Sequence, residues 1–422
     1  MPQDAGSLIQ GAATARQAAY EVVRRVFEEG AYADRAFRAA AVDLDARDRA
    51  FAMQLAFGTV QRVRTLDHAI DTLGRRPVRK LDPPVRAALR TGAFQLAYMD
   101  GVPPHAAANE SVELVRAAGL ERAVAFTNAV MRRLAEGIHG LLDRLGETTP
   151  ADAALKHSYP DWIADVWWRE HGRDAALALM EAQNQPPETV VRVTARGRDL
   201  PGERDSELPN ARRVERVPTE WIESGLVWPQ SRGSQLAGLA VGVEQGERVL
   251  DLCAAPGGKA TQLAETAAEV VAVEKHAGRA RELAENVARL GAENVTVVNE
   301  DALELSSDLG TFDRVLVDAP CSGLGVLASR PDLRWRAEPL PELQLALLQA
   351  AADRVNEGGT LTYAVCTMHR AENEDVIDAL GLTLDNLGTA WPSYSHPRRP
   401  EFLLTQPHVH GTSGFFVARM RL

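Results

Sequence analysis

The sequence contains few cysteines and few lysines, and it contains no long apolar run. Its 422 residues include three cysteines, which are too few for a disulfide framework and whose spacing matches no zinc site. No apolar run approaches the roughly 18 residues needed to cross a bilayer. The N-terminus also lacks the basic start and apolar core of a secretory signal. We therefore expect a cytoplasmic protein that holds no metal and has no membrane partner.

The chain has no excess of basic charge: its net charge is −11, which excludes a protein that binds nucleic acid through a uniformly basic surface. Residues 1–150 hold 20 basic and 18 acidic side chains, so the acidity lies in the rest of the chain. A local basic groove is compatible with this balance. The densest basic cluster is Arg75, Arg76, Arg79 and Lys80, which is either a phosphate-binding surface or a solvated loop. Aromatic residues make up 5% of the chain, so no stacking platform for single-stranded RNA is visible.

The hydrophobic pattern divides the chain into three parts. From about residue 14 to 138, apolar residues recur three to four positions apart, as in amphipathic helices. Next come helical stretches, the strand-like TVVRVTARG and a polar segment, GRDLPGERDSELPNARR, that we interpret as a surface excursion. From residue 247, strands alternate with helices, which predicts a doubly wound parallel sheet. The predicted fold is an all-α N-terminal bundle (residues 1–145), a small α+β subdomain (146–240) and a C-terminal α/β Rossmann-like domain (241–422).

A glycine-rich loop follows the first strand of the predicted sheet. The stretch VLDLCAAPGGKATQLAE reads as a strand, a turn and a helix, and Asp251 closes the strand. In open α/β sheets the ligand lies at the carboxyl ends of the strands. Ala254, Ala255, Gly257 and Gly258 have almost no side chain, so the backbone N–H groups of the loop can approach a ligand closely. The spacing is neither that of G-x-G-x-x-G nor that of a Walker phosphate loop.

Acidic residues follow the next two strands. Glu274 ends the second strand, where an acid commonly accepts the ribose hydroxyls of an adenine nucleoside. Asp301 follows the third strand, where a polar side chain can meet an adenine edge. Each alone is equally compatible with a helix N-cap or a solvated acid. Together they favour an adenosine-containing cofactor that carries no phosphate, and S-adenosylmethionine fits that description.

Two of the three cysteines also lie at strand ends. Cys321 follows the fourth strand in DAPCSG, and Cys366 follows a later strand in YAVCT. A buried cysteine is usually a small hydrophobe, but two thiols at the ligand edge beside a methyl donor indicate one chemistry. A thiolate that adds to carbon 6 of a pyrimidine makes carbon 5 nucleophilic enough to take a methyl group. Asp318, beside these thiols, is expected to hold the base.

These motifs resemble those of the bacterial RNA cytosine-5 methyltransferases of the Sun (RsmB) type. The similar stretches are DLCAAPGGK, VDAPCSGLGVLASRPDLRW, TYAVCT and HGTSGFFVARM, in that order. TARQAAYEVV, AFGTVQR and FTNAVMRRL resemble the NusB-like RNA-binding domain fused to that branch, and SYPDWI and NQPP resemble its connecting segment. The resemblance runs from about residue 15 to the end. It implies methyl transfer from S-adenosylmethionine to a cytosine of RNA, in this branch of 16S ribosomal RNA.

The resemblance also implies roles for individual residues. Cys366 is then the nucleophile, Cys321 helps to expel the enzyme after transfer, and Asp318 belongs to the same catalytic set, whereas the spacing alone does not decide between the two thiols. The residues implied at S-adenosylmethionine are Cys253, Ala254, Ala255, Pro256, Gly257, Gly258, Lys259, Glu274, Arg279, Asp301 and Asp318. Arg330, Arg334 and Trp335 follow DAPCSG and are candidates for holding the target cytosine outside its stack. We expect a monomer.

Three positions depart from the family pattern. Val365 stands where the family usually has Thr before the nucleophile, and Glu274 stands where Asp is commoner. The stretch QSRGSQ at residues 230–235 replaces a more acidic pattern, which puts in doubt any role carried over to that segment. None of these changes removes a catalytic group.

Two other functions stay open at this point. One is an RNA-binding or ribosome-assembly factor that kept the cofactor fold and lost the activity; the intact Cys321, Cys366, Asp318 and Lys259 speak against it. The other is the same chemistry on transfer RNA or DNA. The NusB-like region favours ribosomal RNA over both, by analogy.

Overall fold

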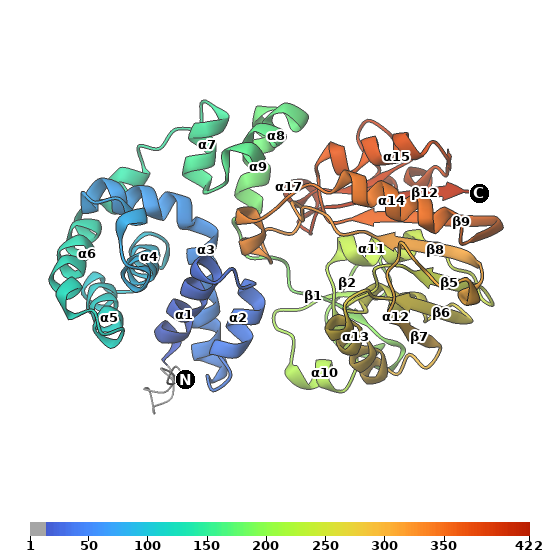
Figure 1. Ribbon diagram of the computed structural model, residues 1–422, viewed down its shortest axis with the longest axis horizontal. Coiled ribbons are helices and arrows are strands. Elements are labelled where there is room, and N and C mark those ends of the chain that lie inside the picture. The colour runs from blue at the N-terminus through green and yellow to red at the C-terminus, as the bar shows by residue number, and fades with distance from the viewer. Residues whose placement is uncertain (1–13) are drawn as a thin grey trace. The chain divides into compact units, whose positions relative to one another are not determined.

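The computed structural model describes residues 14–422, which form two compact units (Figure 1). Unit 1 comprises the chain up to Met180 together with the short segment Arg330–Arg336. Unit 2 comprises Glu181–Ser329 and Ala337–Leu422. The division of the chain at residues 145 and 240 stays a prediction. Within the described residues, no helix is both long and apolar enough to cross a membrane.

Unit 1 is built from helices, as the apolar spacing predicts. The first helix begins at a capping box in which Thr14 and Gln17 accept each other's backbone N–H groups, and it buries Val22, Val23 and Val26 on one face. The helices pack around a shared core of mainly Ala, Val and Leu side chains. They are α1 (Ala15–Glu28), α2 (Ala33–Ala40), α3 (Ala46–Gly74), α4 (Pro83–Tyr98), α5 (Pro104–Ala117), α6 (Glu121–Leu142), α7 (Pro150–His157), α8 (Asp161–His171) and α9 (Arg173–Ala182).

The segment Arg330–Arg336 is part of this helical unit. The sequence predicts that side chains of this segment hold the target cytosine, but Arg334 and Trp335 have other partners. Arg334 is fully buried and donates to the carbonyl oxygens of Gln61 (3.1 Å) and Ser158 (3.0 Å). Trp335 donates its indole N–H to the carbonyl oxygen of Val60 at 2.7 Å. The prediction that these two side chains hold a target base is wrong, because their polar groups already satisfy buried helix carbonyls.

Unit 2 contains a four-stranded antiparallel sheet in the order β2-β3-β1-β4. Strand β3 of this sheet lies inside GRDLPGERDSELPNARR, the segment interpreted as a surface excursion. That interpretation is wrong for the end of the segment, because Leu208 and Ala211 are buried. Its elements are β1 (Val190–Val193), β2 (Glu203–Arg204), β3 (Ala211–Arg213), α10 (Thr219–Glu223) and β4 (Val227–Pro229).

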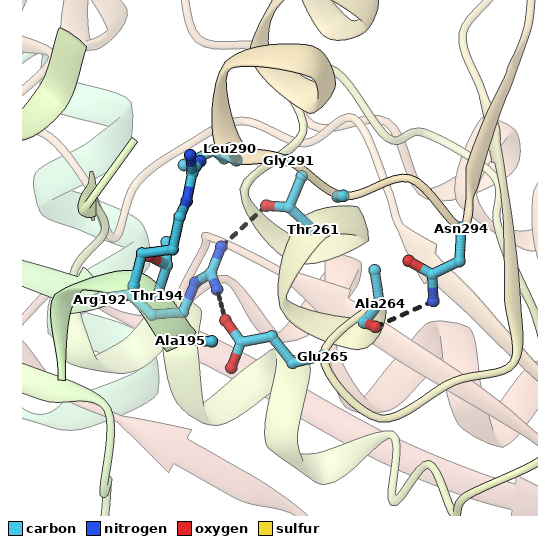
Figure 2. A pocket seen from close by; sticks show the side chains of 11 residues that line it. Arg192, Thr194, Ala195, Thr261, Ala264, Glu265, Leu290, Gly291 and Asn294 are labelled. Carbon is cyan, nitrogen blue, oxygen red and sulfur yellow. Dashed lines mark hydrogen bonds and ion pairs between the residues drawn. The ribbon is translucent and has the colours of Figure 1, made fainter. Parts of the chain in front are cut away.

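The buried Arg192 connects this small sheet to the helix that begins at the glycine-rich loop. Its guanidinium donates to the hydroxyl of Thr261 at 2.8 Å and pairs with Glu265 (Figure 2). A third bond of 3.3 Å reaches the carbonyl oxygen of Gly258. Arg192 also donates to Gln230 at 3.0 Å. A buried arginine is tolerated only with such partners, so the small sheet holds the start of that helix in place.

The larger sheet of unit 2 has eight strands, in the order β10-β12-β9-β8-β5-β6-β7 with β11 paired to β12. The strands from β5 to β9 pair in parallel, and β12 is antiparallel to β9, which confirms the predicted Rossmann-like domain. The strands are β5 (Arg248–Asp251), β6 (Glu269–Val273), β7 (Val295–Val298), β8 (Phe312–Asp318), β9 (Val355–Val365), β10 (Thr383–Leu384), β11 (Leu403–Thr405) and β12 (Phe415–Arg421).

Helices cover both faces of this sheet. Right-handed crossovers that step in opposite directions from β5 and β8 put α12 and α13 on one face and α14 on the other (Figure 1). Helix α13 buries Ala280, Leu283, Val287 and Leu290, three or four residues apart, and ends at Gly291 with φ 68°. The helices of this domain are α11 (Arg232–Ala240), α12 (Gly258–Leu263), α13 (Ala277–Leu290), α14 (Pro341–Ala352), α15 (Glu374–Leu380), α16 (Leu387–Ala390) and α17 (Pro407–His410).

Candidate active site

The carboxyl ends of the parallel strands β7, β6, β5, β8 and β9 lie in one row. The paired residues run to the last position of β5, β6 and β8, so these ends are level with one another. The acids and one thiol singled out in the sequence end or follow these strands. In the order of the sheet they are Asp301, Glu274, Asp251, Asp318 and Cys366. The edge of the sheet therefore holds residues that are up to 115 positions apart in the chain.

The glycine-rich loop occupies residues 252–257 between β5 and α12. Gly257 has φ 109°, a conformation that side chains rarely adopt, and a Cβ there would lie 2.8 Å from Leu283. Arg279 from α13 donates to the carbonyl oxygen of Ala255 at 3.0 Å, and Asn286 donates to that of Pro256 at 2.9 Å. The loop is thus clamped against α13 and keeps one shape.

Lys259 in the first turn of α12 crosses to the next strand and pairs with Asp318. Its Nζ lies 2.7 Å from Oδ2 of Asp318, and its side chain is 8% exposed. The ammonium also lies 4.9 Å from the centre of the Phe415 ring, a cation–π contact. The pair places one positive and one negative charge at the end of β8, beside the loop that carries Cys321.

Asp251 is fully buried, and neither oxygen of its carboxyl group has a hydrogen-bond partner within residues 14–422. Burial, and then the carboxylate of Asp318, raise the pKa of Asp251 to about 7, although Lys259 acts in the opposite direction. Sequence reasoning placed this residue at the strand end but gave it no role. A buried acid with unused acceptor positions suits a ligand that brings a cation or hydrogen-bond donors.

Glu274 and Asp301 each have partners that fix their carboxylates. One oxygen of the buried Glu274 accepts the backbone N–H of His276 at 2.9 Å, and the other lies 3.4 Å from Arg279. Asp301 pairs with Lys275 at 2.7 Å, and this bond is the main reason why its pKa is lowered. Both acids are therefore fixed acceptors at neighbouring strand ends.

Cys321 and Cys366 lie together, with their sulfur atoms 3.4 Å apart, and both are partly exposed. The hydrogen bond from Cys321 is the main cause that lowers the pKa of Cys366, and the Lys259 ammonium lowers it further against burial and Asp318. The pKa of Cys321 is raised by that same bond, by burial and by the charge of Glu372. Both directions favour Cys366 over Cys321 as the thiol that gives up its proton.

Cys253 in the glycine-rich loop has a different environment. Burial and then the carboxylates of Asp251, Asp318 and Glu274 raise the pKa of Cys253. Because the thiolate is the reactive form, this third cysteine is kept inert.

A cavity of about 560 Å³ in unit 2 adjoins the loop that follows Cys321. Gly325 of this loop donates its backbone N–H to the carbonyl oxygen of Cys366 at 2.9 Å, and Gln185, Ser329 and Phe415 also line the cavity. Among the described residues, none of the side chains that line it is basic. The cavity therefore suits an uncharged ring better than a phosphate group.

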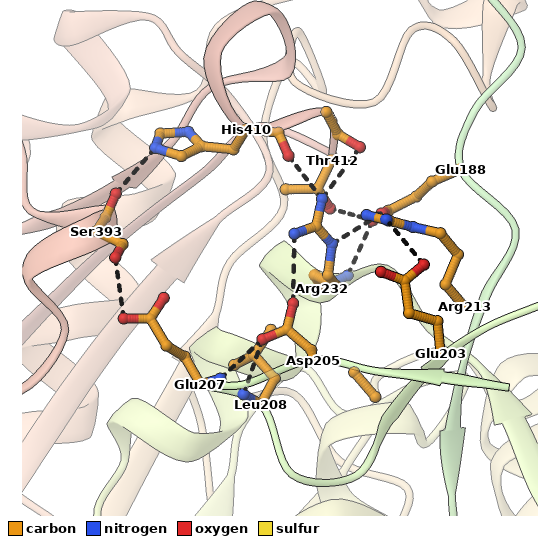
Figure 3. Close-up of polar contacts among 12 residues, drawn as sticks. Glu188, Glu203, Asp205, Glu207, Leu208, Arg213, Arg232, Ser393, His410 and Thr412 are labelled. Atoms are coloured by element: carbon orange, nitrogen blue, oxygen red, sulfur yellow. Dashed lines mark hydrogen bonds and ion pairs between the residues drawn. The ribbon is translucent and has the colours of Figure 1, made fainter.

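Arg232 joins the segments that form one wall of this cavity (Figure 3). Its guanidinium bonds Glu188 at 2.9 Å, Asp205 at 3.4 Å and the carbonyl oxygen of His410 at 2.6 Å. Glu188 in turn accepts the hydroxyl of Thr412. Ser231, next to Arg232, stands at the acidic position of the family pattern, and its hydroxyl caps α11 by accepting the backbone N–H of Ser234 at 3.3 Å.

Comparison with known proteins identifies the family. Residues 239–421 match the family described as 16S rRNA methyltransferase RsmB/F, and residues 13–136 match the NusB family. Ribosomal RNA small subunit methyltransferase B of Thermus thermophilus is 36% identical over 341 residues, which cover 79% of this chain and 78% of that protein. The protein of the same name from an Escherichia coli strain is 32% identical over 389 residues, covering 86% and 89%.

The fold has a close counterpart among solved structures. The crystal structure of PH0851 superposes with a TM-score of 0.82 at 22% identity, over 98% of this chain and 100% of that chain. This structural match extends through both units, and the alignments with the sequence relatives also include residues of both units. This chain therefore belongs to the RsmB/F family of S-adenosylmethionine-dependent 16S rRNA methyltransferases and carries an N-terminal NusB-family region.

Proposed function

We propose that this protein transfers a methyl group from S-adenosylmethionine to carbon 5 of a cytosine in 16S ribosomal RNA, through a covalent bond between Cys366 and carbon 6. The observation that carries the proposal is the pair of sulfur atoms 3.4 Å apart at the sheet edge, beside the ion pair of Lys259 and Asp318. A cysteine that only packs in a core requires neither a second thiol nor a buried ion pair next to it, so these neighbours favour a catalytic role. The family supplies the substrate class.

The residues at the ends of β5, β6 and β7 fit S-adenosylmethionine. Asp251 has unused buried acceptors, Glu274 and Asp301 are fixed acids suited to hydroxyl and amino donors, and Ala254 and Ala255 of the loop have almost no side chain. Bound there, S-adenosylmethionine supplies an electrophilic methyl group on a cationic sulfur. We assign its binding to residues 253–259, Glu274, Arg279, Asp301 and Asp318.

The chemistry on the cytosine is assigned to the ends of β8 and β9. The thiolate of Cys366 adds to carbon 6, and the electron pair of the carbon 5–carbon 6 double bond becomes available at carbon 5, which takes the methyl group. The proton on carbon 5 then leaves to a base, the double bond re-forms, and the bond from carbon 6 to sulfur breaks. Cys321, 3.4 Å from the leaving sulfur, assists this release.

Asp318 and Lys259 orient the ring during these steps. A carboxylate accepts from the exocyclic amino group and from a protonated ring nitrogen, which draws electrons toward the ring nitrogen and favours attack at carbon 6. Lys259 fixes the position of the Asp318 carboxylate, with its Nζ 2.7 Å from Oδ2.

The RNA strand meets two surfaces in this proposal. The target cytosine leaves its stack to reach Cys366, and the cavity beside Gly325, which no basic side chain lines among the described residues, accommodates a neighbouring base. The exposed cluster of Arg75, Arg76, Arg79 and Lys80 in unit 1 supplies phosphate contacts. We expect the protein to do this as a monomer in the cytoplasm.

The test is methylation by the full-length protein with methyl-labelled S-adenosylmethionine. Unmethylated 16S rRNA, transfer RNA and duplex DNA are offered in parallel, and the labelled nucleoside is identified after digestion. We expect label in 5-methylcytosine from 16S rRNA alone. Label in transfer RNA or DNA instead would overturn the substrate, and no label in any of them despite measurable binding of the cofactor would favour an assembly factor.

A further inference from the structure

The residue after each active-site cysteine joins the two loops. Ser322 follows Cys321 and Thr367 follows Cys366, and their hydroxyl oxygens lie 2.9 Å apart in the buried interior. The two positions are 45 residues apart in the chain, so this bond fixes the loop after β8 against the end of β9.

A buried carboxylate holds this junction. Glu372 is fully buried, and its carboxylate accepts both the backbone N–H of Ser322, at 2.9 Å, and the Ser322 hydroxyl. It also accepts the backbone N–H of Leu340 at 3.1 Å and the side-chain amide of Gln344 at 3.0 Å. No lysine or arginine pairs with it within residues 14–422, so four hydrogen bonds alone offset the loss of its hydration.

The backbone of Glu372 is tied to the strand that leads to Cys366. Tyr363 in β9 donates its buried hydroxyl to the carbonyl oxygen of Glu372 at 2.7 Å. One residue therefore contacts both sides of the thiol pair: its backbone is fixed to β9, and its side chain grips the loop of Cys321. Neither contact touches the thiols themselves.

We propose that Glu372 is a positioning residue that sets the distance between the sulfur atoms of Cys321 and Cys366 through Ser322 and Thr367. Without the carboxylate, Ser322 loses two of its bonds and the loop of Cys321 is no longer held at one distance from β9. The catalytic consequence rests on the proposed function, whereas the sulfur–sulfur distance depends on the geometry alone. The negative charge of Glu372 also raises the pKa of the Cys321 thiol.

The distance is measured directly with phenylarsine oxide, which releases water as it bonds two neighbouring thiols. Full-length protein is titrated with this probe in the absence of RNA and cofactor. A Cys321→Ala variant gives the affinity for phenylarsine oxide when only one of the two active-site thiols is present. The test variants are Glu372→Ala and Thr367→Val, which remove the two ends of the junction. Glu374→Gln is the matched control, because Glu374 at the start of α15 is also buried but bonds His396, at 3.1 Å, and not Ser322.

We expect both test variants to bind phenylarsine oxide roughly tenfold more weakly than wild type, and Glu374→Gln to bind it like wild type. Glu372→Gln should stay within about threefold of wild type, because its amide oxygen keeps three of the four bonds and its N–H can donate to the Ser322 hydroxyl. The thermal unfolding transition shows whether each variant is folded. Wild-type affinity in Thr367→Val, or in a folded Glu372→Ala, overturns the proposal.

Methylation kinetics provide the second readout. For Glu372→Ala and Thr367→Val we expect kcat to fall on the order of 10²-fold while KM for 16S rRNA is unchanged, because misplacement of reacting groups costs rate rather than binding. Glu372→Gln should recover most of that loss. If wild type methylates no RNA, the proposed function fails, and the phenylarsine oxide titration still decides the role of Glu372.

Discussion

The edge of the larger sheet has two halves that are built in different ways. At the ends of β5, β6 and β7 the functional groups are carboxylates: Glu274 accepts the backbone N–H of His276, and Asp301 pairs with Lys275 of the neighbouring loop. At the ends of β8 and β9 they are two thiols whose placement depends on contacts between segments far apart in the chain. The first half is a set of fixed acceptors, which suits the binding of a small cation, whereas the second half is a reactive pair that must be aligned.

The largest effect should come from the reactive half. Cys366→Ala removes the nucleophile, so kcat for methylation of 16S rRNA should fall by at least roughly 10⁴-fold, as for other covalent catalysts. The affinity for S-adenosylmethionine, measured by equilibrium binding, should stay within about twofold of wild type, since an unchanged binding half leaves that free energy unchanged. An active Cys366→Ala enzyme would refute the assignment of the nucleophile and move it to Cys321.

The second largest effect concerns Asp251 at the end of β5, and it is measured as the stability of the protein without ligand. The folded pKa of Asp251 is about 7, above the value of about 4 for an unfolded chain. The folded state therefore binds more protons between pH 4 and 7, and stability is lost as the pH rises through that window. At pH 8 Asp251→Asn should increase the free energy of unfolding by up to about 4 kcal/mol, and at pH 5, which is about one unit above the unfolded pKa, the increase should shrink to roughly 1.4 kcal/mol.

Urea unfolding at the two pH values measures this difference, and Asp313→Asn is the control with the opposite sign. The N–H of Arg248 is the main cause that lowers the pKa of Asp313, and its carboxylate accepts that N–H at 2.8 Å. Asp313→Asn should therefore decrease stability at pH 8. Equal stability of wild type and Asp251→Asn at pH 8 would show that the fold does not disfavour the ionised form of Asp251.

The two halves also differ in how far the sequence could predict them. Alternating strands and helices with acids at the strand ends predict the row of Glu274, Asp301 and Asp318, because parallel strands must present their carboxyl ends at one edge. Glu372 could not be predicted, since it lies in HRAENED, a charged run typical of a solvated helix. Only the packing of η5 (Arg370–Glu372) against β9 and the loop of Cys321 buries it.

Two arginines show the same limit of pattern-based reasoning. Arg334 follows the DAPCSG motif closely, which favoured a substrate contact, but its segment packs into the helical unit and its donors meet helix carbonyls. Arg232 lies beside Ser231, the position that departs from the family pattern, and its partners Glu188 and Asp205 lie in a stretch with no recognisable motif. In both cases the partner is distant in sequence, so spacing carries no signal.

Within the reactive half, the two thiols should be separable by a smaller effect. In Cys321→Ala, attack by Cys366 survives while release is slowed, so turnover should fall on the order of 10²-fold and a covalent protein–RNA adduct should accumulate. Denaturing gel electrophoresis with labelled 16S rRNA detects the adduct as a shifted band. The double variant Cys321→Ala/Cys366→Ala should give no shifted band, and a band there would place the covalent bond elsewhere.

The smallest effect concerns the binding of RNA, for which neither half of the sheet edge offers unpaired positive charge: Lys259 is neutralised by Asp318. Arg75, Arg76, Arg79 and Lys80 are exposed, and within residues 14–422 none of them forms an ion pair. Changing all four to Gln should raise KM for 16S rRNA roughly tenfold, leave kcat unchanged and flatten the dependence of KM on salt, because fewer counterions are released.

The matched control for this cluster changes Arg122 and Arg132 to Gln. These exposed side chains of α6 already face carboxylates, Asp82 at 3.5 Å and Glu136 at 4.0 Å, so they have less charge to offer a phosphate. KM and its salt dependence should therefore stay close to wild type. A quadruple variant with unchanged salt dependence would mean that the phosphate contacts lie outside this loop, and that the RNA is held mainly by the chemistry of the sheet edge.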